Sequence, residues 1–157
     1  MRNWLLAIIL TGAAVPTAGL VQSAPADEPA RHAFSVKYQD LKWEKTNPEQ
    51  GTNSPEVAIL HQDTKETELF IRSPKNYHVP RHWHSSDETI TVLRGTFILK
   101  HDGSEDRTTL NVGDFGYMPA KMVHEAWTGP GEETVYFITT DGAFDINWVK
   151  EPPPATH

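Results

Sequence analysis

The sequence predicts an all-β fold, a double-sheet jelly roll (double-stranded β-helix), on three observations. About ten short runs rich in β-branched and aromatic residues follow one another along the chain. Turn-forming Gly, Pro, Asn and Asp separate these runs at close spacing. No run beyond the amino-terminal stretch has the apolar period of a long helix, and 157 residues suffice to close a single core. We therefore predict one β-barrel domain.

The first 26 residues have the pattern of a secretory signal peptide. Residues 1–3 carry a positive charge, residues 4–10 are apolar, and residues 24–26 have the small-x-small form of a cleavage site. We expect cleavage after Ala26, with Ser23 as the alternative, and hence a periplasmic or secreted protein. The apolar run is shorter than the ~20 residues of a membrane span, so we expect no membrane partner after cleavage.

Composition narrows the class of partner. Without Arg2, 13 of the 14 Lys and Arg remain against 21 Asp and Glu, a formal charge of −8. An acidic chain without basic runs argues against nucleic acid and anionic membranes, which leaves small molecules as the expected ligands. The chain has no cysteine, so no disulfide supports the fold.

The predicted barrel covers residues 27–150, and the proline-rich residues 151–157 form a tail that cannot continue a sheet. Its strands are expected where residues alternate between apolar and polar or are β-branched, and Asp102-Gly103 is a hairpin turn signal. In order, the expected strands cover residues 34–38, 57–60, 68–72, 80–84, 88–93, 96–100, 108–112, 115–118, 123–127, 134–140 and 144–149.

Residues 80–95 contain half of a candidate metal site. His82 and His84 are two residues apart, so in a strand both side chains project from the same face. Glu88 follows after enough chain to turn the strand, and it shares one face with Ile90 and Val92. Two imidazoles and a carboxylate suit a divalent transition metal and argue against Cu(I) or calcium.

A second motif follows, with Gly113, Pro119 and His124. Together the two motifs resemble the two motifs of cupins, and the variant most similar to this chain is the small single-domain bacterial cupin with a conserved type 2 barrel. The resemblance covers residues 80–124 and implies a metal site of His82, His84, Glu88 and His124. It also implies a homodimer, because the amino-terminal strand of cupins often lies against a neighbouring subunit.

The chain departs from the cupin pattern at three positions. Asn76 and Lys121 replace glycines, and Thr128 replaces an asparagine. Asn tolerates a positive φ, whereas Lys fits such a turn less easily. No departure removes a ligand.

Four ligands on one side of a six-coordinate ion leave up to two positions for water, dioxygen or substrate. Fe, Mn, Ni, Zn and Cu all suit such a site, and the sequence does not choose among them. We expect a metal-dependent oxygenase acting on a small organic molecule; a lyase or isomerase, or a binding module without turnover, are the alternatives. Tyr117 is the candidate catalytic acid or base. Four side chains are assigned to the barrel lining and core: Phe97, Leu99, Phe115 and Phe137.

Overall fold

The expected runs become eleven strands in the computed structural model, which describes residues 32–149. The predicted signal peptide (1–26) and tail (151–157) lie outside these residues. The strands are β1 Glu44–Lys45, β2 Glu56–Gln62, β3 Thr67–Ser73, β4 His78–Trp83, β5 Glu88–Arg94, β6 Phe97–His101, β7 Thr108–Leu110, β8 Phe115–Met118, β9 His124–Thr128, β10 Thr134–Thr140 and β11 Asn147–Trp148. Two 3-10 helices accompany them, η1 Tyr38–Asp40 and η2 Pro48–Asn53.

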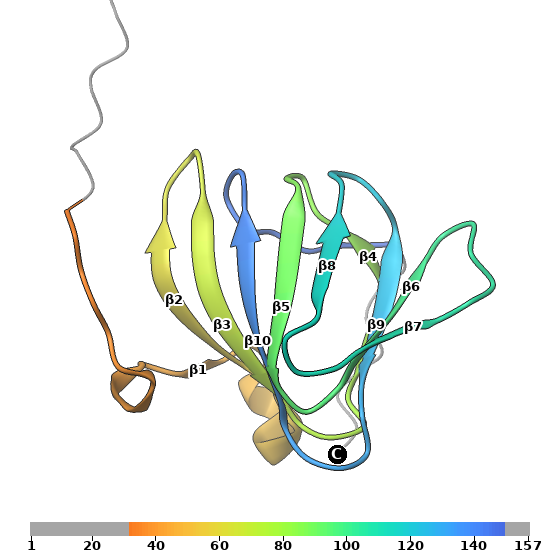
Figure 1. Cartoon of the computed structure of the whole chain (residues 1–157), viewed down its shortest axis with the longest axis horizontal. Helices are drawn as coiled ribbons and strands as arrows, with labels where there is room; N and C mark the ends of the chain where they lie inside the picture. The colour runs from red at the N-terminus through yellow and green to blue at the C-terminus, as the bar shows by residue number, and fades with distance from the viewer. Residues whose placement is uncertain (1–31, 150–157) are drawn as a thin grey trace, which may run out of the picture. The chain divides into compact units, whose positions relative to one another are not determined.

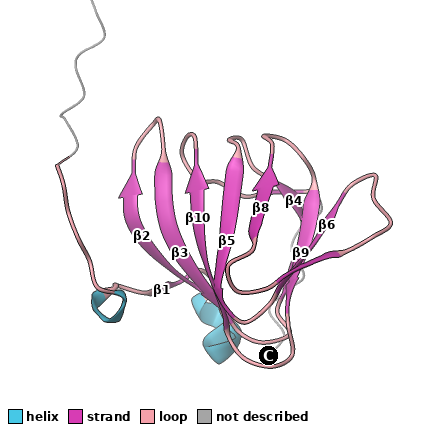
Figure 2. Ribbon diagram, viewed as in Figure 1, coloured by secondary structure: helices cyan, strands magenta, loops and turns pink. Residues whose placement is uncertain are grey.

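The strands form two antiparallel sheets, as Figure 1 shows. One has the order β1-β2-β3-β10-β5-β8 and the other β11-β4-β9-β6-β7. From β3 onward, most consecutive strands lie in different sheets, so that neighbours such as β3 and β10 come from distant parts of the chain. Strands dominate the described chain, and its helices are short 3-10 segments (Figure 2). The predicted all-β jelly roll is confirmed.

Strand alternation sets which side chains face the space between the sheets. In β5, Glu88, Ile90 and Val92 are buried while the residues between them are less covered, as the sequence predicts. The main apolar cluster gathers inward side chains of both sheets: Leu69, Ile71, Ile90, Val92, Phe97, Leu99, Leu110, Met118, Ala126, Tyr136 and Ile138. The predicted core positions of Phe97 and Leu99 are therefore confirmed.

Two aromatic side chains lie on the opposite face from the one the sequence predicts. Phe115 is 60% exposed and pairs with Thr91, which points away from the interior. Gly116 takes the inward position, where an added Cβ would lie 3.2 Å from Leu110. Phe137 is half-buried and packs on Phe70, with ring centroids 5.0 Å apart, outside the main apolar cluster. The assignment of both rings to the interior is wrong.

The expected strand at residues 34–38 is also wrong, because no strand precedes β1 in the described chain and η1 begins at Tyr38. The edge of the larger sheet is formed instead by the two residues of β1, which pair with Val57 and Glu56 of β2.

The turn after β5 requires glycine. Gly95 has φ 73°, and a Cβ there would lie 2.8 Å from Thr134 Oγ1 and 2.9 Å from the Glu133 carbonyl oxygen. This turn sends the chain from one sheet to the other and so fixes β5, which carries Glu88, against β6, which carries Phe97.

No helix among residues 32–149 is long and apolar enough to cross a membrane.

Candidate metal centre

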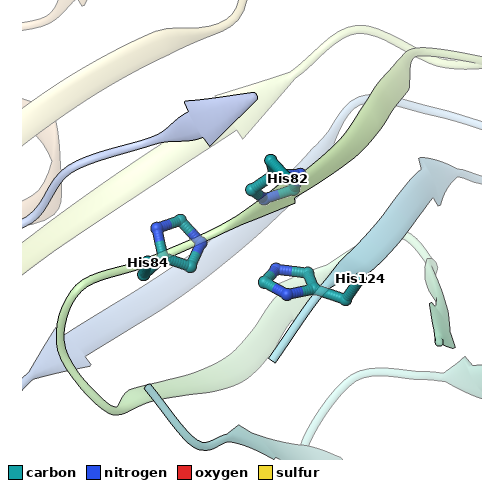
Figure 3. A group of neighbouring side chains, drawn as sticks. All are labelled: His82, His84 and His124. Carbon is teal, nitrogen blue, oxygen red and sulfur yellow. The ribbon is translucent and has the colours of Figure 1, made fainter. Parts of the chain in front are cut away.

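Three histidines converge between the sheets (Figure 3). His82 lies near the end of β4, His84 directly after it, and His124 begins β9. The register of β4 and β9 pairs His82 with His124. Ring centroids are 4.2 Å apart for that pair and 5.0 Å for His82 and His84. All three are buried, and one ring nitrogen of each lies within 4.8 Å of the others, so the group could hold a metal ion.

Backbone carbonyls orient the three rings. A carbonyl oxygen only accepts, so Nδ1 of each ring carries the proton and Nε2 keeps its lone pair. His82 Nδ1 donates to the carbonyl oxygen of Pro80 at 2.6 Å, and His124 Nδ1 donates to that of Met122 at 3.0 Å. His84 Nδ1 donates to the carbonyl oxygen of Asp145. This is the tautomer that a metal ligated through Nε2 requires.

Burial also keeps the imidazoles neutral. Desolvation lowers the pKa of His82 to about 3 and that of His124 to about 4, and it lowers the pKa of His84 as well. Neutral imidazoles are the form that binds metal, so the site needs no proton release from these rings near neutral pH.

Glu88 lies beside the triad. Its side chain is almost fully buried, and desolvation raises its pKa to about 8. Glu88 Oε2 is 3.4 Å from Nε2 of His84 and 3.7 Å from Nε2 of His124. Within residues 32–149, neither Glu88 Oε2 nor His84 Nε2 has a hydrogen-bond partner. A cation would satisfy both of these buried acceptor atoms at once, so the donor set fits a divalent metal.

The positions where the chain departs from the cupin motifs keep the backbone that the motifs need. Asn76 has φ 57° and Lys121 φ 66°, the left-handed conformation that glycine usually takes. The Lys121 N–H donates to the carbonyl oxygen of His84 at 2.8 Å. Thr128 Oγ1 accepts from the Tyr77 N–H at 2.8 Å, which anchors the segment leading into β4.

Tyr117 lies outside the cluster. Its side chain is 51% exposed, and its residue pairs with Thr89 on the outer side of β5. The hydroxyl donates to Asp87 Oδ2 at 2.6 Å. The other carboxylate oxygen of Asp87 accepts from the Ala120 N–H at 2.8 Å. Tyr117 therefore supports the loops beside Glu88, and a catalytic role for it stays a prediction.

A cavity of about 410 Å³ opens beside the metal ligands, in the range typical of small-molecule sites. Both sheets line it. The apolar part of its wall comes from Pro55, Ile71, Val79, Pro80, Ile90, Phe97, Ala126, Ile138, Phe144, Ile146 and Trp148. The polar part away from the ligands comes from Thr46, Asn47, Gln50, Tyr77, His78 and Tyr136.

Sequence patterns alone did not place Tyr136, Tyr77 and Gln50 in this wall. Tyr136 pairs with Ile71 in β3 and with Val92 in β5, both inward residues. Knowledge of that register would have placed Tyr136 inside. His78, expected at the surface, also reaches the cavity, although its ring is largely exposed and contacts Glu125 Oε1 at 2.6 Å.

Solved structures share this architecture. The chain is similar to the polyketide cyclase RemF from Streptomyces resistomycificus, with 17% identity over 78% of this chain and 89% of that one, at a TM-score of 0.65. It is similar to the DMSP lyase DddQ from Ruegeria pomeroyi DSS-3, with 15% identity over 65% and 56% of the two chains, at a TM-score of 0.55. At these identities the likeness concerns the fold alone.

A third similar structure is that of Rhodobacter sphaeroides SigE in complex with the anti-sigma ChrR, with 22% identity over 67% of this chain and 51% of that one, at a TM-score of 0.54. No curated protein sequence matches the chain significantly. The family model described as "ChrR Cupin-like domain" matches residues 31–145. With the two-sheet barrel and the buried histidine triad, this match places the chain in the cupin superfamily, as a member of the ChrR cupin-like family.

Proposed function

We propose that this protein is a metal-dependent enzyme of the oxygenase type that acts on a small, mostly apolar organic molecule. His82, His84, Glu88 and His124 would hold one Fe, Mn, Ni, Zn or Cu ion. The observation that carries the proposal is the pair of buried acceptor atoms without a partner, Glu88 Oε2 and His84 Nε2, at the wall of a cavity of about 410 Å³. A metal that served only to hold the barrel together would need no cavity.

The wall of the cavity supports oxygenase chemistry over a lyase or isomerase step. A lyase or isomerase needs an acid or base beside the substrate. Apart from the four ligands, the ionisable side chains that line the cavity are His78, Tyr77 and Tyr136. Burial raises the pKa of both tyrosines, so neither is a ready base near neutral pH. A redox-active ion with open positions would supply the reactive group itself, by polarising a bound oxygen atom or by passing electrons to dioxygen.

Each of two alternative functions is supported by a specific observation. A lyase or isomerase could use Tyr136 as a proton donor, and the similar folds of a polyketide cyclase and a DMSP lyase support this reading. A binding module without turnover fits the apolar lining equally well, and an anti-sigma factor is among the proteins with a similar fold. Export to the periplasm or beyond remains a proposal from residues 1–26.

The test combines metal content with oxygen uptake. The full chain, produced with its amino-terminal segment, is analysed by inductively coupled plasma mass spectrometry beside His82→Ala and Glu88→Gln, with His32→Ala as a control for losing an exposed histidine outside the site. Oxygen uptake is followed over phenols, diols and thiols. We expect one metal ion per wild-type chain, retained in His32→Ala and lost or weakened in the site variants together with oxygen uptake.

Other outcomes separate the alternatives. A tightly bound metal that is inert to the whole panel would favour a lyase, an isomerase or a binding module. Wild-type protein that holds no metal after incubation with each of the five ions would rule out the metal centre itself.

A further inference from the structure

The cavity contains a second polar group, remote from the metal ligands. Tyr136 on β10 lines the cavity, and its hydroxyl lies 3.1 Å from Oγ of Ser73 at the end of β3. Tyr136 is nearly fully buried and Ser73 completely so. A hydroxyl pair is costly to bury in an apolar interior unless its hydrogen-bonding capacity is used.

The two hydroxyls can make more hydrogen bonds than the one that joins them. Each hydroxyl has one O–H donor and two acceptor lone pairs, so one hydrogen bond between them uses a single proton. Neither hydroxyl makes a second hydrogen bond within residues 32–149. One O–H donor is therefore left for a ligand. Since burial raises the pKa of Tyr136, its hydroxyl stays protonated and able to donate.

Further polar groups line the same cavity. The Tyr77 hydroxyl reaches Gln50 Oε1 at 3.5 Å, and both side chains belong to the wall. Gln50 comes from η2, so its amide donors are supplied by a segment separate from the strands that carry the metal ligands. No lysine or arginine in the described part of the chain lines the cavity, so an anionic group bound near Tyr136 would lack a counter-charge from the protein.

Strand register separates Tyr136 from Glu88 along β10. Glu88 pairs with Thr140 at one end of β10, whereas Ser73 pairs with Thr134 at the other end. Tyr136 lies four residues from Thr140, the partner of Glu88, which is about 13 Å along the backbone. The inward residue of β10 between Tyr136 and Thr140 is Ile138, which is apolar. The cavity thus has a metal-binding end, an apolar middle and a hydroxyl-bearing end.

We propose that Tyr136, held in place by Ser73, donates a hydrogen bond to an acceptor oxygen at the end of the ligand remote from the metal. The cavity then selects an uncharged molecule with two chelating oxygens at one end, an aromatic or aliphatic middle and a carbonyl or ether oxygen at the other. This inference rests on the proposed metal centre, because the ion holds the chelating end.

The test uses two catechols that differ only at the remote end. The first is 3,4-dihydroxyacetophenone, which has a carbonyl, and the second is 4-ethylcatechol, in which a methylene group replaces it. Binding of each to the zinc-loaded full chain is measured by calorimetry, since zinc is redox-inert and prevents turnover. We expect Tyr136→Phe to weaken binding of the ketone by about 5- to 10-fold and of 4-ethylcatechol by less than about 2-fold, as the loss of one hydrogen bond implies.

Two further variants sharpen the result. Ser73→Ala should also reduce the preference for the ketone, because the Tyr136 hydroxyl loses its anchor. Tyr38→Phe, which removes a hydroxyl from an exposed tyrosine in η1, should leave the preference unchanged. Zinc content, measured by mass spectrometry, should stay at one ion per chain in all variants.

The outcomes distinguish three failures. Wild-type protein without bound zinc would overturn the metal centre and the inference with it. Zinc-loaded Tyr136→Phe that keeps the wild-type preference for the ketone would overturn only the role of Tyr136. Zinc-loaded wild type that binds neither catechol would overturn the proposed ligand class.

Discussion

Nδ1 of His84 donates a hydrogen bond to the backbone carbonyl of Asp145, 61 residues further along the chain. The Asp145 side chain also contacts the residue after His84. Its carboxylate accepts from the Ser85 N–H at 2.8 Å and from the Ser85 hydroxyl at 2.6 Å. Asn147 donates to that carboxylate at 2.9 Å. The segment before β11 therefore sets the orientation of one of the three buried imidazoles.

Removing the Asp145 carboxylate should weaken metal binding without removing a ligand. In Asp145→Ala the two bonds from Ser85 and the one from Asn147 are lost, so the carbonyl that orients His84 becomes mobile. We expect zinc affinity, measured by competition with a chromophoric chelator, to fall by about 10-fold, the lower range for partners of metal ligands. Asp114→Ala is the matched control, because its carboxylate also accepts a backbone hydrogen bond, from the Asn111 N–H at 2.8 Å. Equal affinities in the two variants would contradict the role of Asp145.

In the metal-free protein, the buried histidines and Glu88 should make the free energy of unfolding depend on pH in opposite directions. The folded-state pKa values of His82, about 3, and His124, about 4, lie below 6.5, so stability is lost as pH falls below 6.5. The folded-state pKa of Glu88, about 8, lies above 4.5, so stability is lost as pH rises from 4.5 to 8. Below pH 6.5, the stability lost through the two histidines exceeds the stability gained through Glu88. Above pH 6.5, only Glu88 changes the stability. The contribution of the site should therefore peak near pH 6.5.

The Glu88→Gln variant isolates the loss of stability that Glu88 causes as pH rises. Its amide has nearly the same shape and no charge to desolvate, so metal-free Glu88→Gln should become more stable than metal-free wild type as pH rises. The difference in the free energy of unfolding should reach the order of a few kcal/mol at about pH 9. Urea denaturation in a chelator, from about pH 5 to 9, measures it. Parallel profiles for the two proteins would show that Glu88 is not strongly desolvated.

Lys121→Gly should stabilise the fold. Lys121 has φ 66°, which costs a side-chain-bearing residue about 1–2 kcal/mol, while the greater freedom of glycine in the unfolded chain offsets part of the gain. We expect the free energy of unfolding to rise by about 0.5–1 kcal/mol, with the hydrogen bond from residue 121 to His84 retained. Lys100→Gly, in the middle of β6, should lower it instead. Destabilisation by Lys121→Gly would mean that the lysine side chain compensates the backbone conformation.

The expected homodimer can be tested on the outer face of the larger sheet. Phe115 on β8 and Leu93 on β5 leave 60% and 44% of their surface exposed there. If this apolar patch is the interface, Phe115→Asp should convert a dimer to a monomer, as measured by light scattering after size exclusion. Ile59→Asp changes an equally exposed apolar residue on β2 and should leave the dimer intact. A monomeric wild type would exclude the homodimer.

Local periodicity made most of the metal centre predictable, whereas the rest of the cavity depends on pairing between distant strands. His82 and His84 share a face because strand side chains alternate, and this holds whatever the partner strand is. Tyr136 enters the cavity only through the register of β10 with β3 and β5. In β8 alternation alone left two choices, and the large aromatic residues Phe115 and Tyr117 pointed to the wrong face because the inner face has room only for Gly116 and Met118.

The placement of Gln50 on η2 has a consequence for ligand preference. The metal ligands come from β4, β5 and β9 with the turn after β4, while η2 lies in the connection between β1 and β2. Insertions or substitutions in that connection can reshape the remote end of the cavity while the strands that hold the ion stay unchanged. The ligand preference of the cavity can therefore be altered without changing the candidate metal ligands, and exchanging residues 46–55 with those of a relative is a direct route to transferring that preference.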